Sequence, residues 1–332
     1  MGSLASTTLL VFVSAFSFAQ AIPPKPPDVP AQEKPFIGEY HANGALANIL
    51  ERSGKLYVSK EKTECALTPE SAGEFQTSAG CALGKKISFE GHEGTIESLS
   101  MDRSSFDRAQ LGDVAHSFHI APVHPVGELR REALAAQPSA QPAGLRKPDL
   151  VELVKLDPTV HLDIRYAGTN NFMGTPFYTQ ARAFLQRPAA EAVVRANRKL
   201  HAYGYGVLIH DGYRPWYVTK MFWDATPNDK KDFVADPKKG SNHNRGCAVD
   251  LSLYNLRTGK EVEMPGGYDE MSDRSYPGYS GGTSLQRWRR DLLRAIMESE
   301  GFKVEKVEWW HFDYKDGDSY PVLNIPFEKI GD

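Results

Sequence analysis

The chain has 332 residues, of which 41% are apolar and 24% charged, so a packed core is expected and wholesale disorder is excluded. The length accommodates two domains. The net charge of −3, spread over both signs, gives no support to a nucleic-acid partner, which usually needs a basic face.

Residues 1–21 have the pattern of a secretory signal peptide. An apolar run at 8–18 is followed by the small-x-small sequence Ala19 to Ala21, and then by a Pro-rich, extended segment at 22–34. The apolar run is short for a membrane span. We therefore expect cleavage near Ala21, export to the periplasm or the extracellular cell envelope, and no stable membrane span in the mature form.

Two other interpretations of the N-terminus stay open. No Lys or Arg precedes the apolar run, which leaves an uncleaved membrane anchor as one alternative. Met1 and Gly2 followed by Ser6 also fit a myristoylation signal, although that signal would not explain the apolar run.

Residues 35–127 are predicted to form a small β-rich accessory domain. Short alternating runs at 55–60, 86–90 and 95–101 are separated by Gly and Ser, which is typical of hairpins. For this region a spacer or stability element is favoured over a module that binds the cell wall or a partner.

Cysteines and histidines in this region raise two further questions. In an exported protein Cys65 and Cys81 could form a disulfide, but two buried thiols fit their spacing equally well. A group of histidines near the end of the region lacks a supporting metal motif and is more typical of a surface loop: His116, His119 and His124.

An Ala/Pro/Gln-rich stretch at 128–148 is predicted to be an interdomain linker, partly helical at its start, and 149–332 to be the second domain. Two amphipathic helices are expected there, at 187–204 and at 284–301, the second capped by Ser284. Strands are expected at 205–214, 248–255 and 303–312. Helices and strands mix without a regular βαβ repeat, which favours an α+β domain.

Asp250 is the first candidate for chemistry. It alternates with Val249 and Leu251 along an apolar strand, where a carboxylate must be compensated by a cation, a metal or hydrogen bonds. His243 lies in the Ser/Asn/Gly-rich loop before this strand and can fold back toward it, and imidazole with carboxylate suits zinc. Strand alternation places the side chain of Cys247 on the face opposite to Asp250, so Cys247 is predicted to be a small buried residue rather than a ligand.

Two further stretches supply candidates. Arg214 follows the strand end in "IHDGYRP", where a guanidinium can stabilise a developing oxyanion or simply pair with Asp211. Glu308 and His311 lie in "EWWH", three residues apart. On a straight strand they would face opposite sides, so one shared site requires a bend or a bulge. Taken alone, each stretch is better explained by an ordinary structural role.

Together, "SxHxxGxAxD", "DGYRP" and "EWWH" resemble the zinc-dependent D-alanyl-D-alanine dipeptidases of the vancomycin-resistance type, a group that shares its fold with the Hedgehog signalling domain. The resemblance covers about 149–332 and extends to "RYAGTNNFMG", "GYDEMSDRS" and "RRDLLRAIMESEGF". It implies a Hedgehog-like D,D-peptidase domain that binds one Zn²⁺ per chain. The segment between "DGYRP" and "SNHNRG" is short for the family, which would widen the mouth of the site.

The resemblance also implies a role for each matching residue. The zinc ligands are His243, Asp250 and His311; the catalytic residues are Glu308, as general base, and Arg214, at the oxyanion; the substrate-binding residues are Asp269, at the substrate ammonium, with Tyr166 and Ser241.

The expected activity is hydrolysis of D-Ala-D-Ala, or of a related peptide derived from peptidoglycan, by metal-activated water. A D,D-carboxypeptidase or a muropeptide endopeptidase with the same metal site is the first alternative, and Asp269 discriminates between them. A zinc-stabilised binding module without turnover is the second alternative. The presence of both Glu308 and Arg214 disfavours it, because a structural zinc site needs neither.

Overall fold

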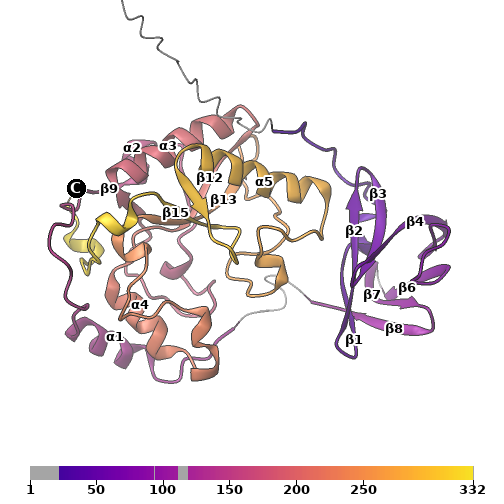
Figure 1. Ribbon diagram of the computed structural model, residues 1–332, viewed down its shortest axis with the longest axis horizontal. Helices are drawn as coiled ribbons and strands as arrows, with labels where there is room; N and C mark the ends of the chain where they lie inside the picture. Colours follow the sequence, from indigo (N-terminus) through magenta and orange to yellow (C-terminus); the bar gives the residue numbers. More distant parts are fainter. Residues whose placement is uncertain (1–21, 93, 111–118, 332) are drawn as a thin grey trace, which may run out of the picture.

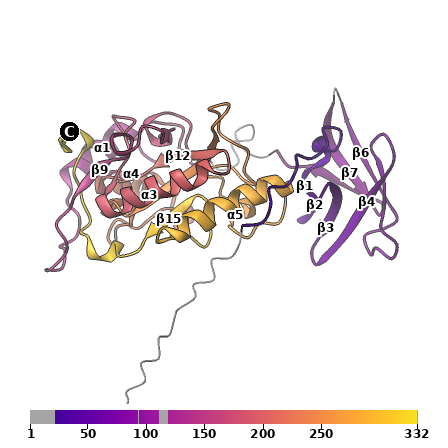
Figure 2. The same cartoon turned by 90° about the horizontal axis from the view of Figure 1, so that it is seen from above.

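The computed structural model describes residues 22–92, 94–110 and 119–331, so the predicted signal peptide and His116 lie outside the described residues (Figure 1). Both views show two bodies side by side, a β-barrel and a larger unit that mixes helices and strands (Figures 1 and 2). His119 and His124 are exposed, as expected of a loop. None of the helices in the described part of the chain has both the length and the apolarity needed to cross a membrane.

The predicted β-rich region is a closed antiparallel barrel in which the first strand pairs with the last. Its strands are β1 (Gly38–Ala42), β2 (Ala45–Arg52), β3 (Lys55–Lys60), β4 (Thr63–Ser71), β5 (Glu74–Thr77), β6 (Lys86–His92), β7 (Thr95–Met101) and β8 (Ser104–Arg108). Alternate side chains, among them Tyr40, Ile49 and Leu99, fill the barrel core. Cys65 and Cys81 form a disulfide between β4 and the segment after β5, which settles the question that their spacing left open.

The second unit is built on a largely antiparallel sheet with the strand order β10-β12-β13-β15-β14. Its strands are β10 (His161–Leu162), β12 (Tyr205–Asp211), β13 (Ala248–Asn255), β15 (His311–Tyr314) and β14 (Phe302–Val304); β9 (Leu150–Glu152) and β11 (Phe184–Gln186) pair separately. The helices are α1 (Val126–Ala135), α2 (Leu153–Leu156), α3 (Arg187–His201), α4 (Trp216–Ala225) and α5 (Ser284–Ser299). This unit therefore has the predicted mixture of helices and strands.

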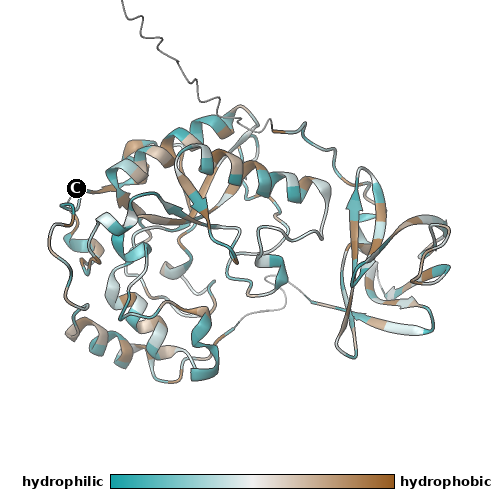
Figure 3. Cartoon of the chain, viewed as in Figure 1, coloured by the Kyte–Doolittle hydropathy of each residue, from teal (hydrophilic) through white to brown (hydrophobic). Residues whose placement is uncertain are grey.

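Helices α3 and α5 pack against each other and against the sheet. Each shows brown apolar bands between teal polar ones, as expected of amphipathic helices (Figure 3). The predicted apolar positions are buried, including Val193 and Leu200 in α3 and Leu285 and Leu292 in α5.

The predicted cap of α5 is wrong by one residue. Thr283 is the N-cap: its hydroxyl accepts from the Gln286 backbone, and the Gln286 side chain accepts from the Thr283 backbone. Ser284 is the first helical residue, and its backbone N–H donates to Glu51 of the barrel instead. A local capping box thus marks where this helix begins, and the first helical residue joins it to the barrel.

The predicted strand at 303–312 is also wrong, because it is a hairpin. β14 and β15 pair with each other, and a turn that includes Glu308 separates them. The bend that a shared site required is therefore this turn.

The predicted linker at 128–148 is helical at its start, as expected, and packs on the second unit. Residues 128–135 of the linker belong to α1, which packs on α4 and buries Leu129 and Ala133. Further along, the Arg146 backbone N–H donates to the Ser319 carbonyl at 2.8 Å. The two apolar residues one helical turn apart give this stretch a buried face that its overall composition conceals.

Candidate active site

All of the predicted site residues line one cavity of about 130 Å³. They are Tyr166, Arg214, Ser241, His243, Asp250, Asp269, Glu308 and His311. The rest of the lining is mainly apolar and aromatic, with Phe172, Phe222 and Trp310 among its members. The site residues come from segments spread over more than 140 residues of sequence, and they converge on one small pocket, as is common for ligand sites.

The sheet brings two of the candidate ligands together. Asp250 on β13 lies directly opposite His311 on β15. His243 lies in a short 3-10 turn just before β13, and Gly246 ends that turn with a left-handed φ of 69°. A Cβ on Gly246 would lie 2.6 Å from the Leu150 side chain, so glycine suits both the turn and the close packing.

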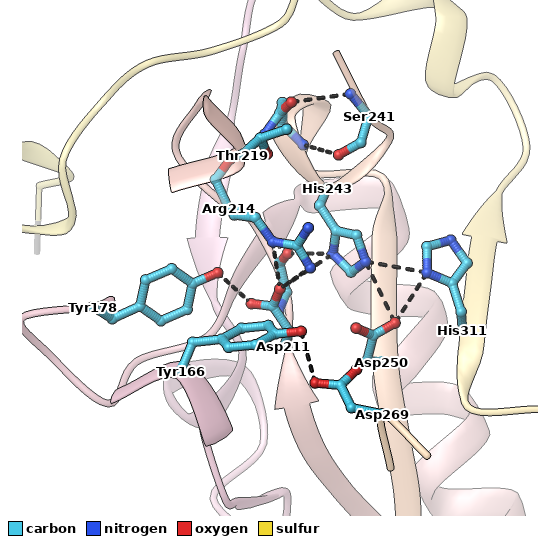
Figure 4. A network of polar contacts seen from close by, with 12 residues as sticks. Tyr166, Tyr178, Asp211, Arg214, Thr219, Ser241, His243, Asp250, Asp269 and His311 are labelled. Carbon is cyan, nitrogen blue, oxygen red and sulfur yellow. Dashed lines mark hydrogen bonds and ion pairs between the residues drawn. The ribbon is translucent and has the colours of Figure 1, made fainter. Parts of the chain in front are cut away.

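His243, Asp250 and His311 point toward a common centre (Figure 4). His243 Nε2 lies 3.2 Å from His311 Nδ1, and Asp250 Oδ1 lies 3.4 Å and 3.0 Å from these two nitrogens. Tetrahedral ligands about 2.0–2.1 Å from zinc are separated by about 3.3–3.4 Å, close to these edges. Within the described ranges this is the one group of three or more side chains placed to share a metal ion.

The chemistry of the donor atoms also fits a cation. None of the described residues donates a hydrogen bond to the buried Asp250 Oδ1, which is costly unless a positive charge compensates it. Cys247 is fully buried, as predicted, and burial raises the pKa of its thiol to about 12. Cys247 is not among the side chains whose donor atoms lie within 4.8 Å of one another, so the candidate set is one carboxylate and two imidazoles.

Each candidate ligand is oriented by a neighbour. His243 Nδ1 lies 2.8 Å from the Gly212 carbonyl, and His311 Nε2 lies 3.1 Å from Asp313 Oδ1. These contacts hold the protons on the outer nitrogens and leave His243 Nε2 and His311 Nδ1 free to bind a metal. Tyr268 donates its hydroxyl to Asp250 Oδ2 at 3.0 Å.

Asp313 and Tyr268 were missed by the sequence reasoning. A signal existed for Asp313, which stands two residues after His311 and therefore on the same face of its strand. Tyr268 precedes Asp269 in the chain, but no spacing rule indicates that its hydroxyl reaches β13.

Arg214 pairs with Asp211, one of the two alternatives that the sequence left open, and its side chain also lines the cavity. Its Nε and Nη2 donate to Asp211 Oδ2 at 3.0 and 2.8 Å, and Tyr178 donates to the other oxygen, Oδ1, at 2.6 Å (Figure 4). The guanidinium also lies over the ring of Tyr166, 5.3 Å from its centroid, and lines the cavity. Burial lowers the pKa of Arg214, but Asp211 and the other acidic groups around it together raise this pKa well above its ordinary value, so the guanidinium stays charged.

Asp269 sits at the cavity in a strained backbone conformation, with a φ of 55°. Its Oδ2 accepts the Tyr166 hydroxyl at 3.0 Å. Burial, together with the charges of Asp250 and Glu308, raises the pKa of this carboxyl well above its ordinary value. A buried carboxylate beside other carboxylates is stabilised by an incoming cation, which suits a contact with a substrate ammonium.

Glu308 and Ser241 complete the lining. Glu308 Oε2 lies 3.7 Å from His311 Nδ1, with 23% of its side chain exposed. Its burial raises its pKa, against the opposing effect of the two histidines, and this moves a carboxylate toward the range useful for a general base. The Ser241 backbone N–H donates to Asn244 Oδ1 at 3.0 Å, which fixes the loop that carries His243.

Known proteins resemble the second unit. Residues 146–329 match a family model described as D-ala-D-ala dipeptidase, a match that excludes the barrel strands. The D-alanyl-D-alanine dipeptidase of Escherichia coli is 35% identical over 179 residues, covering 54% of this chain and 91% of its own length. The enzyme of the same name from Enterococcus faecium is 35% identical over 196 residues, covering 52% and 95%, and that from Streptomyces coelicolor is 32% identical over 175 residues, covering 47% and 87%.

Proposed function

Since this chain belongs to the D-Ala-D-Ala dipeptidase family of metallopeptidases, we propose that its domain at 149–332 hydrolyses D-Ala-D-Ala with one zinc ion held by His243, Asp250 and His311. The observation that carries the proposal is the triangle of donor atoms with edges of 3.0–3.4 Å around an otherwise unpaired carboxylate oxygen. A Hedgehog-like fold for this domain is part of the same proposal.

When bound, zinc supplies Lewis acidity and lowers the pKa of water to about 7. Glu308 takes a proton from the attacking water and delivers it to the leaving amine. Arg214 stabilises the negative charge that develops on the carbonyl oxygen, from a position fixed by Asp211. The reaction therefore uses no serine or cysteine nucleophile.

Substrate choice rests on Asp269. Its carboxylate pairs with the free ammonium of the dipeptide, and Tyr166 holds it in place. A D,D-carboxypeptidase or a muropeptide endopeptidase acts on chains whose amino end is blocked, so a buried acid at that position favours the dipeptidase. Ser241, at the cavity wall, contacts the substrate backbone in this arrangement.

We also propose a setting for the reaction, from the sequence pattern at 1–21. We infer export after cleavage near Ala21, so that the enzyme acts on dipeptide derived from peptidoglycan. Retention of the segment before residue 22 in the mature chain, measured by mass spectrometry, would contradict this inference.

The test is an amine-release assay on D-Ala-D-Ala, L-Ala-L-Ala and N-acetyl-D-Ala-D-Ala, run for the wild type and for Glu308→Gln. Loss of a general base is expected to slow turnover by about 10²–10⁴-fold while the bound zinc stays in place. Equal rates for the two proteins would remove Glu308 as the base. Asp269→Ala should abolish cleavage of the free dipeptide. If the wild type also cleaved blocked peptides well, and if Asp269→Ala left that cleavage intact, the carboxypeptidase alternative would be favoured.

A further inference from the structure

We propose that the barrel is a positioning element for the substrate-binding loop at 265–283, and through this loop for Asp269. The proposal rests on the function proposed above and assigns the barrel a part in the reaction, in place of the spacer role that its sequence favoured.

The outer face of the barrel carries buried polar residues that contact this loop. Glu39 on β1 and Asn48 on β2 form a cross-strand pair, and each is less than 10% exposed. Tyr279 lies against both: its hydroxyl donates to Glu39 Oε1 at 2.7 Å and accepts from Asn48 Nδ2 at 3.0 Å. Polar side chains on the outside of a free barrel would be hydrated, so this burial indicates a surface built for contact.

A second set of contacts fixes the end of the loop. The Glu51 backbone N–H donates to the Gly282 carbonyl at 3.1 Å, and Glu51 Oε2 accepts from the Ser284 backbone at 2.7 Å. Arg287 Nη2 donates to the Glu51 carbonyl at 2.6 Å. The loop is therefore held by the barrel at the point where it enters α5.

The loop carries this restraint inward to the cavity. Glu270, next to Asp269, accepts from the Gly267 backbone at 2.7 Å and pairs with Arg274 at 3.3 Å. The Ser275 carbonyl accepts from the backbone of Trp309 at 2.8 Å, one residue after the proposed general base. One cross-linked loop thus joins the barrel contact to Asp269 and to the residue that follows Glu308.

The barrel acts at a distance. Among the described residues that line the catalytic cavity, none belongs to the barrel. Barrel substitutions are therefore expected to change how well the loop presents Asp269, rather than the metal triangle. The signature is a higher KM for a substrate with a free ammonium and little change in zinc content.

The test uses Tyr279→Phe in the full chain, with Tyr276→Phe as the matched control, because Tyr276 is in the same loop and 46% exposed. For Tyr279→Phe we expect KM for D-Ala-D-Ala to rise about 3–10-fold with a smaller change in kcat, and the preference for the free over the N-acetylated dipeptide to fall by the same factor. The variant loses both hydrogen bonds of this hydroxyl, and about 3–10-fold corresponds to the net contribution of one of them. Glu39→Ala should behave alike, whereas Glu39→Gln keeps an acceptor oxygen and should restore wild-type values.

The outcomes separate this proposal from the function on which it rests. An active wild type whose Tyr279→Phe and Glu39→Ala variants match Tyr276→Phe in KM and in preference would overturn the positioning role alone. An inactive, zinc-loaded wild type would overturn the proposed function and this proposal with it. Should Tyr279→Phe fail to fold, the comparison of Glu39→Ala with Glu39→Gln decides.

Discussion

Replacing Asp313 by Ala tests whether the triangle is a metal site without relying on catalysis. Asp313 Oδ1 lies 3.1 Å from His311 Nε2, the ring nitrogen that faces away from the proposed ion. With this acceptor absent, the imidazole can rotate or carry its proton on Nδ1, the nitrogen that zinc requires. The ligand set itself stays complete in this variant.

The expected loss of zinc affinity is about 10–100-fold, or roughly 1.4–2.7 kcal/mol, the range typical of a lost partner of a metal-bound histidine. Asp313→Asn retains an acceptor oxygen but not the charge, so its loss should lie between the wild type and Asp313→Ala. Asp318→Ala is the control, because Asp318 is an exposed carboxylate in the turn after β15.

The assay is a competition titration of each metal-free protein with a chromophoric zinc chelator at constant pH. If Asp313→Ala bound zinc as tightly as Asp318→Ala, Asp313 would not orient a ligand. If the wild type bound no zinc in this titration, the three donor atoms would not form a metal site at all.

Three further outcomes are expected. Asp269→Asn should lower kcat/KM for D-Ala-D-Ala yet raise the Tm of the metal-free protein at pH 8. Because burial raises the folded-state pKa of this carboxyl, the protonated form that favours folding is lost as pH rises. The Tm difference should therefore shrink as pH falls toward about 4, near the pKa of the carboxyl in the unfolded chain. A Tm difference independent of pH would contradict that account. Removing zinc with EDTA should lower the Tm reversibly, since an ion at about 1,000 times its Kd stabilises the native state by about 4 kcal/mol; an unchanged Tm would count against a bound ion. Replacing both Cys65 and Cys81 by Ser should destabilise the barrel by about 2–4 kcal/mol, as monitored by denaturant unfolding, with the free dipeptide still cleaved; unchanged unfolding would mean that the bond adds no stability.

The sequence predicted the elements whose signals are local. The apolar stripes of α3 and α5 and the alternation of β3 and β7 follow directly from side-chain period. His243 and Asp250 were found because a carboxylate in an apolar strand requires an explanation, and the structure brings both to the cavity.

What the sequence concealed depends on tertiary contact. "KVEKVEWWHF" contains no Gly or Pro, so nothing local marks the turn between β14 and β15. Thr283 caps α5 through a Thr-x-x-Gln capping box, a local signal that the prediction overlooked, whereas the contact of Ser284 with Glu51, more than 230 residues away, has no local signal. The role of Asp313 likewise depends on which nitrogen of His311 faces the cavity, which spacing alone does not specify.

The chain at 22–30, which forms neither helix nor strand, lies against the second unit and so determines what a label attached there would sense. The Pro23 carbonyl accepts from the Trp288 indole at 2.8 Å, and the Lys25 ammonium lies 4.9 Å from the centroid of the Tyr205 ring, so the segment runs along the peptidase side before the chain enters the barrel. A fluorophore attached beside Ile22 would therefore sense the flank of α5. Movement of the barrel would be followed better from its hairpin tips, such as the turn between β3 and β4.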